Sequence, residues 1–568
     1  LKITSIPLGM EKLFRFFGKE YGNINQAALL LGSFALVSQV LGLLRDRSFA
    51  HFIGPSPTLD AYYAAFRVPD FIFISIASLA SITVLIPYLS AKMADGQVTD
   101  EARKFLSDVF TAFFFLIVLV SLVAFFLMPD LSQLIAPGFS PAMQAEVTAL
   151  SRIMLLSPIL MGLSSLFGTV TQLFRKFFIY SLSPVLYNLG IIIGIIVFYP
   201  HLGIYGLGAG VALGALLHFG VQALASSQAG FRPKFSLSIN FSEMKHAALI
   251  SVPRTLGLAA NSMSLIFITA LASLLTVGSI SIFNFSYNLQ SVPLNIIGIS
   301  YAVAAFPTLV RSVTAGKLAE FKGHLRGAAR SIVFWSLPAT FLFIVLRAQV
   351  VRVILGSKTF SWESTRLVAA AVAIFAVSVL AQGMIALLSR AYYAKGETRR
   401  PLKINLLSSV LIVIFAFLFV YIFEHVSFFR YFFESLLKVE GIPGTEVLML
   451  PLAYAAGTII NFILQLIYAR RDFMDGEPFI AKTFFQSLGA SFFIGLAAYF
   501  GLNILGPIFG TTTFLGIFLQ GLISGIFGIA VGVLVLYLLK NQELRDLAKT
   551  LHTKFWRVKV VAPPQEGL

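Results

Sequence analysis

The chain has 568 residues, of which 58% are hydrophobic and only 12% are charged, and its mean hydropathy is +0.87. No soluble domain of this length has such a composition, so soluble enzymes and soluble binding modules are excluded. The net charge of +17 suits anionic membrane lipids without a nucleic-acid partner, and the absence of cysteine excludes disulfides, thiol nucleophiles and thiolate metal sites.

Fourteen apolar runs are long enough to cross a bilayer, because about 20 residues of helix span about 30 Å of hydrocarbon. We expect helices, since membrane strands show alternating polarity over about 10 residues. The sequence therefore predicts an all-α polytopic membrane protein. The runs lie near residues 27–50, 59–91, 105–128, 146–174, 178–199, 204–226, 246–275, 279–310, 328–356, 366–394, 402–423, 447–469, 483–506 and 512–539.

The distribution of lysine and arginine predicts the orientation in the membrane. Most of the 42 basic residues fall in segments on the same side as the N-terminus, so both termini are predicted to be cytoplasmic. Three further segments have the amphipathic or basic pattern of membrane-surface elements. They are residues 1–24 at the cytoplasmic N-terminus, residues 424–446 on the outer face and the cytoplasmic tail 541–568.

One short sequence pattern occurs twice, at positions that are six predicted spans apart. Pro184 is followed four residues later by Asn188, and Pro401 is followed four residues later by Asn405. An even number of intervening spans gives two halves of the same orientation, which indicates parallel repeats. The predicted parts are a first six-helix lobe at 25–230, a second six-helix lobe at 231–475 and two C-terminal helices within 476–540.

Charged side chains within the spans are the strongest indication of function. Arg45, Asp60 and Arg67 lie in otherwise apolar sequence, and Arg254 lies inside the seventh span. An isolated charge at membrane depth costs at least about 2.5–3.5 kcal/mol, so such side chains normally face a watery interior and serve a substrate. Two structural roles stay open as alternatives: Arg45 can end the first span at the membrane surface, and Asp60 can form an ion pair with Arg67.

Several motifs together resemble a known family. They are Ser38-Gln39-Val40-Leu41-Gly42-Leu43-Leu44-Arg45-Asp46, Asp60-Ala61-Tyr62-Tyr63-Ala64-Ala65-Phe66-Arg67-Val68-Pro69, Pro87, and Pro293 with Pro307. They are similar to the MurJ (MviN) family of lipid II flippases over nearly the whole chain. The resemblance implies the multidrug/oligosaccharidyl-lipid/polysaccharide exporter fold and movement of undecaprenyl-pyrophosphate-linked peptidoglycan precursor from the inner to the outer leaflet.

The resemblance also implies a site, in which arginines hold the pyrophosphate in a central cavity. Arg45 is retained, and Arg67 occupies a position that the family fills with lysine or arginine. The family's other basic positions are occupied here by Gln39, Phe73 and Ile74, and its Asp-Arg pair by Tyr287 and Asn288. We predict a substrate site formed by Arg45, Asp60, Arg67, Arg254, Gln39 and Asn288, with no metal and no cofactor.

These observations predict a transporter rather than an enzyme. Arginine provides a planar fork of donors that suits an anionic diphosphate. No G-x-x-x-x-G-K-[ST] loop occurs, so an ion gradient or the membrane potential would drive transport. An exporter of another lipid-linked oligosaccharide or of a cationic drug, and a membrane enzyme acting on polyprenyl substrates, are the alternatives. Expected partners are the lipid-linked anionic glycan precursor, membrane lipids and the cell-wall synthesis machinery, in the bacterial cytoplasmic (inner) membrane.

Overall fold

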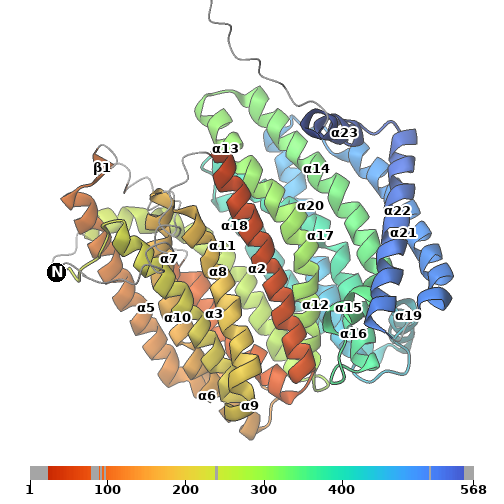
Figure 1. Ribbon diagram of the computed structural model, residues 1–568, viewed down its shortest axis with the longest axis horizontal. Coiled ribbons are helices and arrows are strands. Elements are labelled where there is room, and N and C mark those ends of the chain that lie inside the picture. The colour runs from red at the N-terminus through yellow and green to blue at the C-terminus, as the bar shows by residue number, and fades with distance from the viewer. Residues whose placement is uncertain are drawn as a thin grey trace, which may run out of the picture. The chain divides into compact units, whose positions relative to one another are not determined.

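The computed structural model describes residues 24–77, 89, 93–94, 97–174, 176–236, 241–510 and 513–555. The predicted N-terminal segment and the last part of the tail lie outside these residues, as does Pro87. The chain is built from helices (Figure 1), and the described strands are the antiparallel pair β1 (Met93–Ala94) and β2 (Gln97–Val98). The predicted all-α membrane fold is confirmed.

Residues that contact one another densely divide the chain into two compact units. The first unit comprises the described residues up to Leu289 with Ile354–Ala371 and Thr398–Gly457, and the second comprises Gln290–Val353, Val372–Glu397 and the described residues from Thr458 onward. The predicted six-helix lobes are not tested by these units and stay a prediction.

Most helices of the first unit belong to the predicted first lobe. They are α2 (Ile24–Phe52), α3 (Pro57–Ala77), α5 (Asp100–Ile135), α6 (Pro141–Met154), α7 (Leu156–Leu173), α8 (Phe177–Ile193), the π-helix η1 (Gly194–Phe198), α9 (Tyr199–Leu202) and α10 (Ile204–Gln228). The unit also includes α11 (Phe241–Ser273), α12 (Ser279–Pro293) up to Leu289, α18 (Arg399–His425), α19 (Ser427–Leu437) and the 3-10 helix η3 (Thr445–Leu448).

The second unit contains the remaining helices. They are the π-helix η2 (Leu294–Ile299), α13 (Ser300–Thr314), α14 (Leu318–Val345), α15 (Arg347–Leu355), α17 (Val379–Ala394), α21 (Ala481–Phe509), α22 (Phe514–Leu538) and α23 (Gln542–Phe555). Four helices contribute residues to both units: α12, α15, α16 (Trp362–Val377) and α20 (Met449–Phe473).

Each of the fourteen predicted spans overlaps a helix. Eleven helical segments of the described chain are long and apolar enough to cross a membrane, and the bent pair α16–α17 raises the number to twelve. The two other predicted spans form α2 and α3, which carry the charged residues. Every 18-residue window of α3 contains Asp60, Arg67 and Asp70, which explains why this helix falls short of the apolarity of the others.

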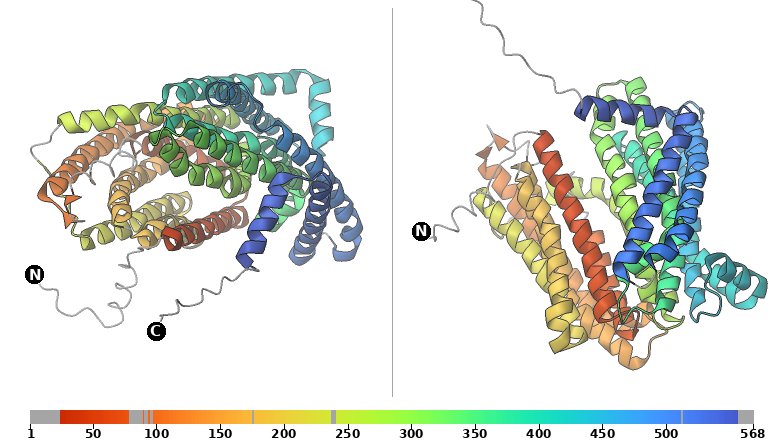
Figure 2. Two further views of the ribbon diagram at one scale, coloured as in Figure 1. Left: turned by 90° about the horizontal axis from the view of Figure 1, so that it is seen from above. Right: turned by 45° about the vertical axis from the view of Figure 1, so that its right-hand side comes forward.

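Glycines allow close helix crossings in the first unit. Helix α8 lies between α2 and α10, as Figures 1 and 2 show with α2 in red and α8 in yellow. A Cβ atom on Gly210 of α10 would lie 2.5 Å from the Cα of Gly194, and one on Gly190 would lie 2.3 Å from the Cα of Gly214. The α8–α10 crossing therefore has no room for a side chain at these positions.

Gly210→Ala is expected to destabilise the protein by about 1–3 kcal/mol, because the added methyl group would force the backbones of α10 and η1 apart. Gly220→Ala is the matched control on the same helix, since its Cβ would meet no atom within 4 Å. Thermal unfolding of both variants in detergent measures the difference. Equal midpoints for Gly210→Ala and the parent chain would contradict the tight crossing.

Helices α13, α14 and α17 and the end of α20 enclose an apolar core in the second unit, which includes Phe321, Tyr392 and Phe473. The Tyr392 hydroxyl donates a hydrogen bond to Asp472 at 2.8 Å. The ammonium group of Lys395 lies 4.6 Å from the centre of the Phe473 ring and 5.4 Å from that of Phe321. Partial burial lowers the pKa of Lys395 from its ordinary value. These contacts join the ends of three helices.

Candidate functional site

A cavity of about 400 Å³ lies inside the first unit, among helices α2, α3, α7, α8, α11 and α12. Its charged lining residues are Arg45, Arg67 and Asp70. Its polar and aromatic lining includes Tyr62, Tyr63, Ser157, Tyr187, Asn261, Ser262, Asn284, Tyr287 and Asn288. The cavity thus combines two guanidinium groups with many neutral hydrogen-bonding groups, within a bundle of membrane helices.

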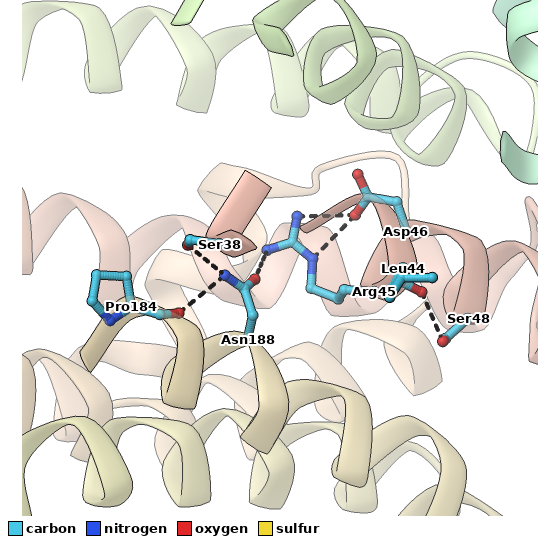
Figure 3. Close-up of polar contacts among 7 residues, drawn as sticks. All are labelled: Ser38, Leu44, Arg45, Asp46, Ser48, Pro184 and Asn188. Atoms are coloured by element: carbon cyan, nitrogen blue, oxygen red, sulfur yellow. Dashed lines mark hydrogen bonds and ion pairs between the residues drawn. The ribbon is translucent and has the colours of Figure 1, made fainter. Parts of the chain in front are cut away.

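Arg45 enters this cavity from α2 and is held by two neighbours (Figure 3). Its Nε and Nη2 atoms donate hydrogen bonds to Oδ1 of Asp46 at 3.1 and 2.9 Å. Its Nη1 atom donates to Oδ1 of Asn188 at 3.2 Å, and the amide nitrogen of Asn188 donates to the Pro184 carbonyl at 3.1 Å and to Ser38 Oγ at 3.4 Å. The guanidinium group is therefore fixed in position and partly neutralised by the buried Asp46 carboxylate.

Arg67 enters the cavity from α3 and is held by neutral groups. Its Nε atom donates to Thr269 Oγ1 at 2.8 Å, and its Nη2 atom donates to Asn284 Oδ1 at 2.9 Å. Thr269 belongs to α11 and Asn284 to α12, so three helices meet at this guanidinium group. Asp70, one turn further along α3, lines the same cavity. Neither hydrogen-bond partner is a carboxylate, but the Asp70 carboxylate lies close enough to attract the Arg67 guanidinium group electrostatically.

Asn288 is the third predicted site residue that lines the cavity. Its side chain forms a hydrogen bond with the Asp46 carboxylate, which connects α12 to the Arg45 cluster. The structure therefore brings together Arg45, Arg67 and Asn288, three residues from three predicted spans.

The other predicted site residues lie elsewhere or are not described. Gln39 is half-buried on α2 and is not among the residues that line the cavity. Asp60 is buried but likewise does not line it. The side chain of Arg254, on α11, lies outside the described residues. The site role of these three residues stays a prediction.

Asp60 binds the first turn of α12. Its Oδ2 atom accepts a hydrogen bond from the Gly278 amide at 2.7 Å, and its Oδ1 atom accepts from the amide and hydroxyl of Ser281 at 2.8 and 2.5 Å. A carboxylate at this place satisfies unpaired amide groups and interacts favourably with the helix dipole. The predicted alternative, a pair with Arg67, is replaced by this cap, which joins α3 to α12.

Further hydrogen bonds connect the ends of α2 and α5 to segments beyond residue 270. The hydroxyl of Thr359 donates to the carbonyls of Ala50 and His51, both at 2.7 Å. The amide of Gly138, just after α5, donates to Ser273 Oγ at 3.1 Å. Together with the Asp60 cap, these bonds form a cluster that we call the end closure. It joins helix ends of the predicted first lobe to the α11–α12 turn and the 357–359 segment, all within the first unit.

Several site residues were missed by the sequence analysis. Asn188 stands out in the sequence only as part of the repeat, whereas in the structure its side chain on α8 accepts a hydrogen bond from Arg45 on α2. Thr269 and Asn284 are ordinary polar residues in apolar spans, and an amide group at membrane depth was the available signal for Asn284. Among the described residues, no three His, Cys, Asp or Glu side chains come together as a metal site.

A family model described as "Lipid II flippase MurJ" matches residues 49–429, about two thirds of the chain. The chain belongs to the MurJ family. This MurJ-family chain is 24% identical over 499 residues to a probable lipid II flippase MurJ of Rickettsia prowazekii (strain Madrid E), which covers 84% of this chain and 97% of that one. It is also 24% identical over 491 residues to lipid II flippase MurJ of Burkholderia cenocepacia, covering 85% and 91%.

Solved structures share the fold of this MurJ-family chain. A lipid II flippase MurJ in an inward closed conformation superposes with a TM-score of 0.70 at 20% identity, covering 92% of this chain and 100% of that one. An inward-facing multidrug resistance transporter of the MATE family and MOP superfamily gives a TM-score of 0.61 at 14% identity, covering 77% and 95%. The MurJ family and the exporter fold predicted from the sequence are thus confirmed.

Proposed function

We propose that this MurJ-family protein moves lipid II, the undecaprenyl-pyrophosphate-linked peptidoglycan precursor, from the inner to the outer leaflet. The supporting observation is the cavity that both Arg45 and Arg67 line. Charged groups at membrane depth are costly, and they occur where a polar substrate passes. A guanidinium group keeps its charge on burial and presents paired donors to phosphate oxygens.

The geometry supports a division of tasks between the two arginines. Arg67 donates hydrogen bonds to the neutral oxygens of Thr269 and Asn284, so a diphosphate that accepts from these donors gains charge-assisted bonds in exchange for neutral ones. Arg45 is already paired with Asp46, which keeps the empty cavity close to electrical balance. A cavity of about 400 Å³ takes the diphosphate end of the headgroup, while the polyprenyl tail stays in the lipid.

The proposed transport cycle is alternating access of a non-enzymatic transporter. With both termini in the cytoplasm, the end closure lies at the outer side of the membrane and separates the cavity from that side. The headgroup enters from the cytoplasmic side, the end closure opens and the headgroup leaves outward. An ion gradient or the membrane potential supplies the energy, since each charge moved through 100 mV is worth about 2.3 kcal/mol. The lipid precursor, membrane lipids and the cell-wall synthesis machinery are the proposed partners, in the bacterial inner membrane.

Complementation of a depletion strain tests this function. Cells that lose their own lipid II flippase receive this chain, Arg45→Ala or Arg254→Ala, and lipid II in the outer leaflet is measured by its accessibility to an externally added probe. We expect the parent chain to restore outer-leaflet lipid II and both variants to restore less. Failure of the parent chain, inserted and expressed at normal levels, would contradict the proposal and indicate another lipid-linked oligosaccharide as cargo.

A further inference from the structure

Helix α19 presents a row of large apolar side chains away from the rest of the first unit. The residues are Phe428, Tyr431, Phe432 and Leu436, with exposed fractions of 81%, 58%, 51% and 59%. Their spacing of three, one and four residues places them on one face of the helix. Four neighbouring side chains of this kind form a patch that a soluble surface rarely leaves uncovered.

The opposite side of α19 is fixed to the protein. Glu434 is buried and accepts a hydrogen bond from the Thr445 hydroxyl at 2.8 Å. The helix ends at Leu437 and is followed by Lys438 in a left-handed conformation, and the Lys438 carbonyl accepts a hydrogen bond from Nε of Arg366 at 3.0 Å. Because both its middle and its end are held, α19 cannot turn its apolar face inward. The exposed apolar side chains of α19 therefore stay on the side that faces away from the first unit.

The apolar row on α19 continues the exposed surface of a membrane-spanning helix. Along α18, Val410, Ile414, Phe417 and Tyr421 form a row of exposed apolar side chains with exposed fractions of 56%, 51%, 53% and 60%. Helix α18 ends at His425, and α19 begins two residues later at Ser427. A helix that starts this close to the end of a span lies at the depth of the lipid headgroups.

We propose that the aromatic face of α19 binds the phospholipid headgroup layer of the membrane that α18 crosses. Amphipathic helices of this kind bury their apolar face about 5–10 Å into the boundary between headgroups and acyl chains, and tyrosine is favoured at that depth. The proposal commits to a lipid surface rather than a second copy of the chain, because α19 directly follows the membrane-spanning helix α18, which itself carries a row of exposed apolar side chains. The segment thereby holds the loop before η3 at the membrane surface.

The bound segment also supports the end closure. Glu446, in η3, accepts hydrogen bonds from the hydroxyl and the amide of Thr276 at 2.5 and 3.3 Å. Thr276 lies two residues before Gly278, whose amide binds Asp60. A lipid-bound α19 therefore anchors the segment that supports the α11–α12 turn.

Spin labelling tests the lipid surface, because the chain has no cysteine and a single introduced one is labelled uniquely. Phe428→Cys and Arg430→Cys, two residues apart and about 200° around the helix, receive a nitroxide in the full-length protein. Ile414→Cys in α18 is the reference for a label in lipid, and Glu440→Cys in the loop after α19 is the reference for a label in water. Each is reconstituted in vesicles of phosphatidylethanolamine and phosphatidylglycerol, and collision with oxygen is compared with collision with a water-soluble nickel chelate.

We expect the oxygen-to-nickel ratio at 428 to be several-fold higher than at 430 and 440, and lower than at 414. Equal ratios at 428 and 430 would overturn the proposal. Spin–spin broadening at 428 that grows with protein density would also overturn it, since it would place a second copy on the patch. Phe432→Cys, one turn further on the same face, gives the same measurement if Phe428→Cys does not fold.

Discussion

Arg67→Ala is expected to lower lipid II translocation at least about tenfold, the largest effect of any single substitution in the cavity. A hydrogen bond to a charged group contributes about 1.5–3 kcal/mol, and Arg67→Ala removes both the charge and the paired donors that would bind the phosphate. The substitution also leaves Thr269 and Asn284 without their donor. The measurement is the rate at which labelled lipid II becomes accessible outside vesicles that contain the purified protein.

One variant separates the charge of Arg67 from its shape, and a second serves as a control. Arg67→Lys keeps the charge but loses the planar fork, so an intermediate rate is expected. Arg103→Ala removes an arginine whose side chain is 55% exposed and pairs with Asp100, and it serves as the matched control with an unchanged rate. A normal rate for Arg67→Ala in well-folded protein would remove Arg67 from the substrate site.

A disulfide across the end closure is expected to reduce translocation to the background rate. His51→Cys combined with Thr359→Cys puts one thiol on each of two segments that now lie side by side, since the Thr359 hydroxyl donates a hydrogen bond to the His51 backbone carbonyl at 2.7 Å. If the cycle requires these segments to separate, oxidation in vesicles stops transport and a reducing agent restores it. The measurement is the same vesicle assay before oxidation, after oxidation and after reduction.

The control pair joins segments that the cycle leaves together. Thr483→Cys with Glu543→Cys connects α21 to α23 in the second unit, where the two side chains are 2.7 Å apart. Its oxidation is expected to leave the rate unchanged, as are both single variants of the closure pair. Undiminished transport with the closure disulfide fully formed would contradict alternating access through this end.

The membrane-spanning helices were predictable from sequence because the thickness of the bilayer sets the minimum length of each apolar segment. A bilayer demands about 20 apolar residues per span, and this demand is readable in any sequence without knowledge of packing. The charged residues of the first two spans stood out for the same reason. Arg45 and Arg67 were predicted to share one cavity, and both line it, because a cation within a span has few stable environments.

Hydrogen-bond partners were not predictable, because they depend on helix packing. Asp60 and Arg67 are seven residues apart and share a face of α3, which suggested a pair. Asp60 instead binds amide groups at the start of α12, more than 200 positions away in sequence. Backbone amides leave no mark in a sequence, and neither do the close approaches that Gly194 and Gly210 permit.

Helix α3 carries the Asp60 cap at its beginning and Arg67 about two turns further on, roughly 10 Å along the helix axis. Both residues bind the same pair of elements, since Asp60 holds the α11–α12 turn and Arg67 holds Thr269 and Asn284 on those two helices. A cargo phosphate that accepts hydrogen bonds from Nε and Nη2 of Arg67 would replace the bonds to Thr269 and Asn284. The Asp60 cap would then be the remaining one of these contacts between α3 and the α11–α12 pair. We therefore predict that cargo binding at Arg67 weakens the attachment of α3 to α11 and α12 and favours opening of the end closure, so that the transporter without cargo stays closed at this end.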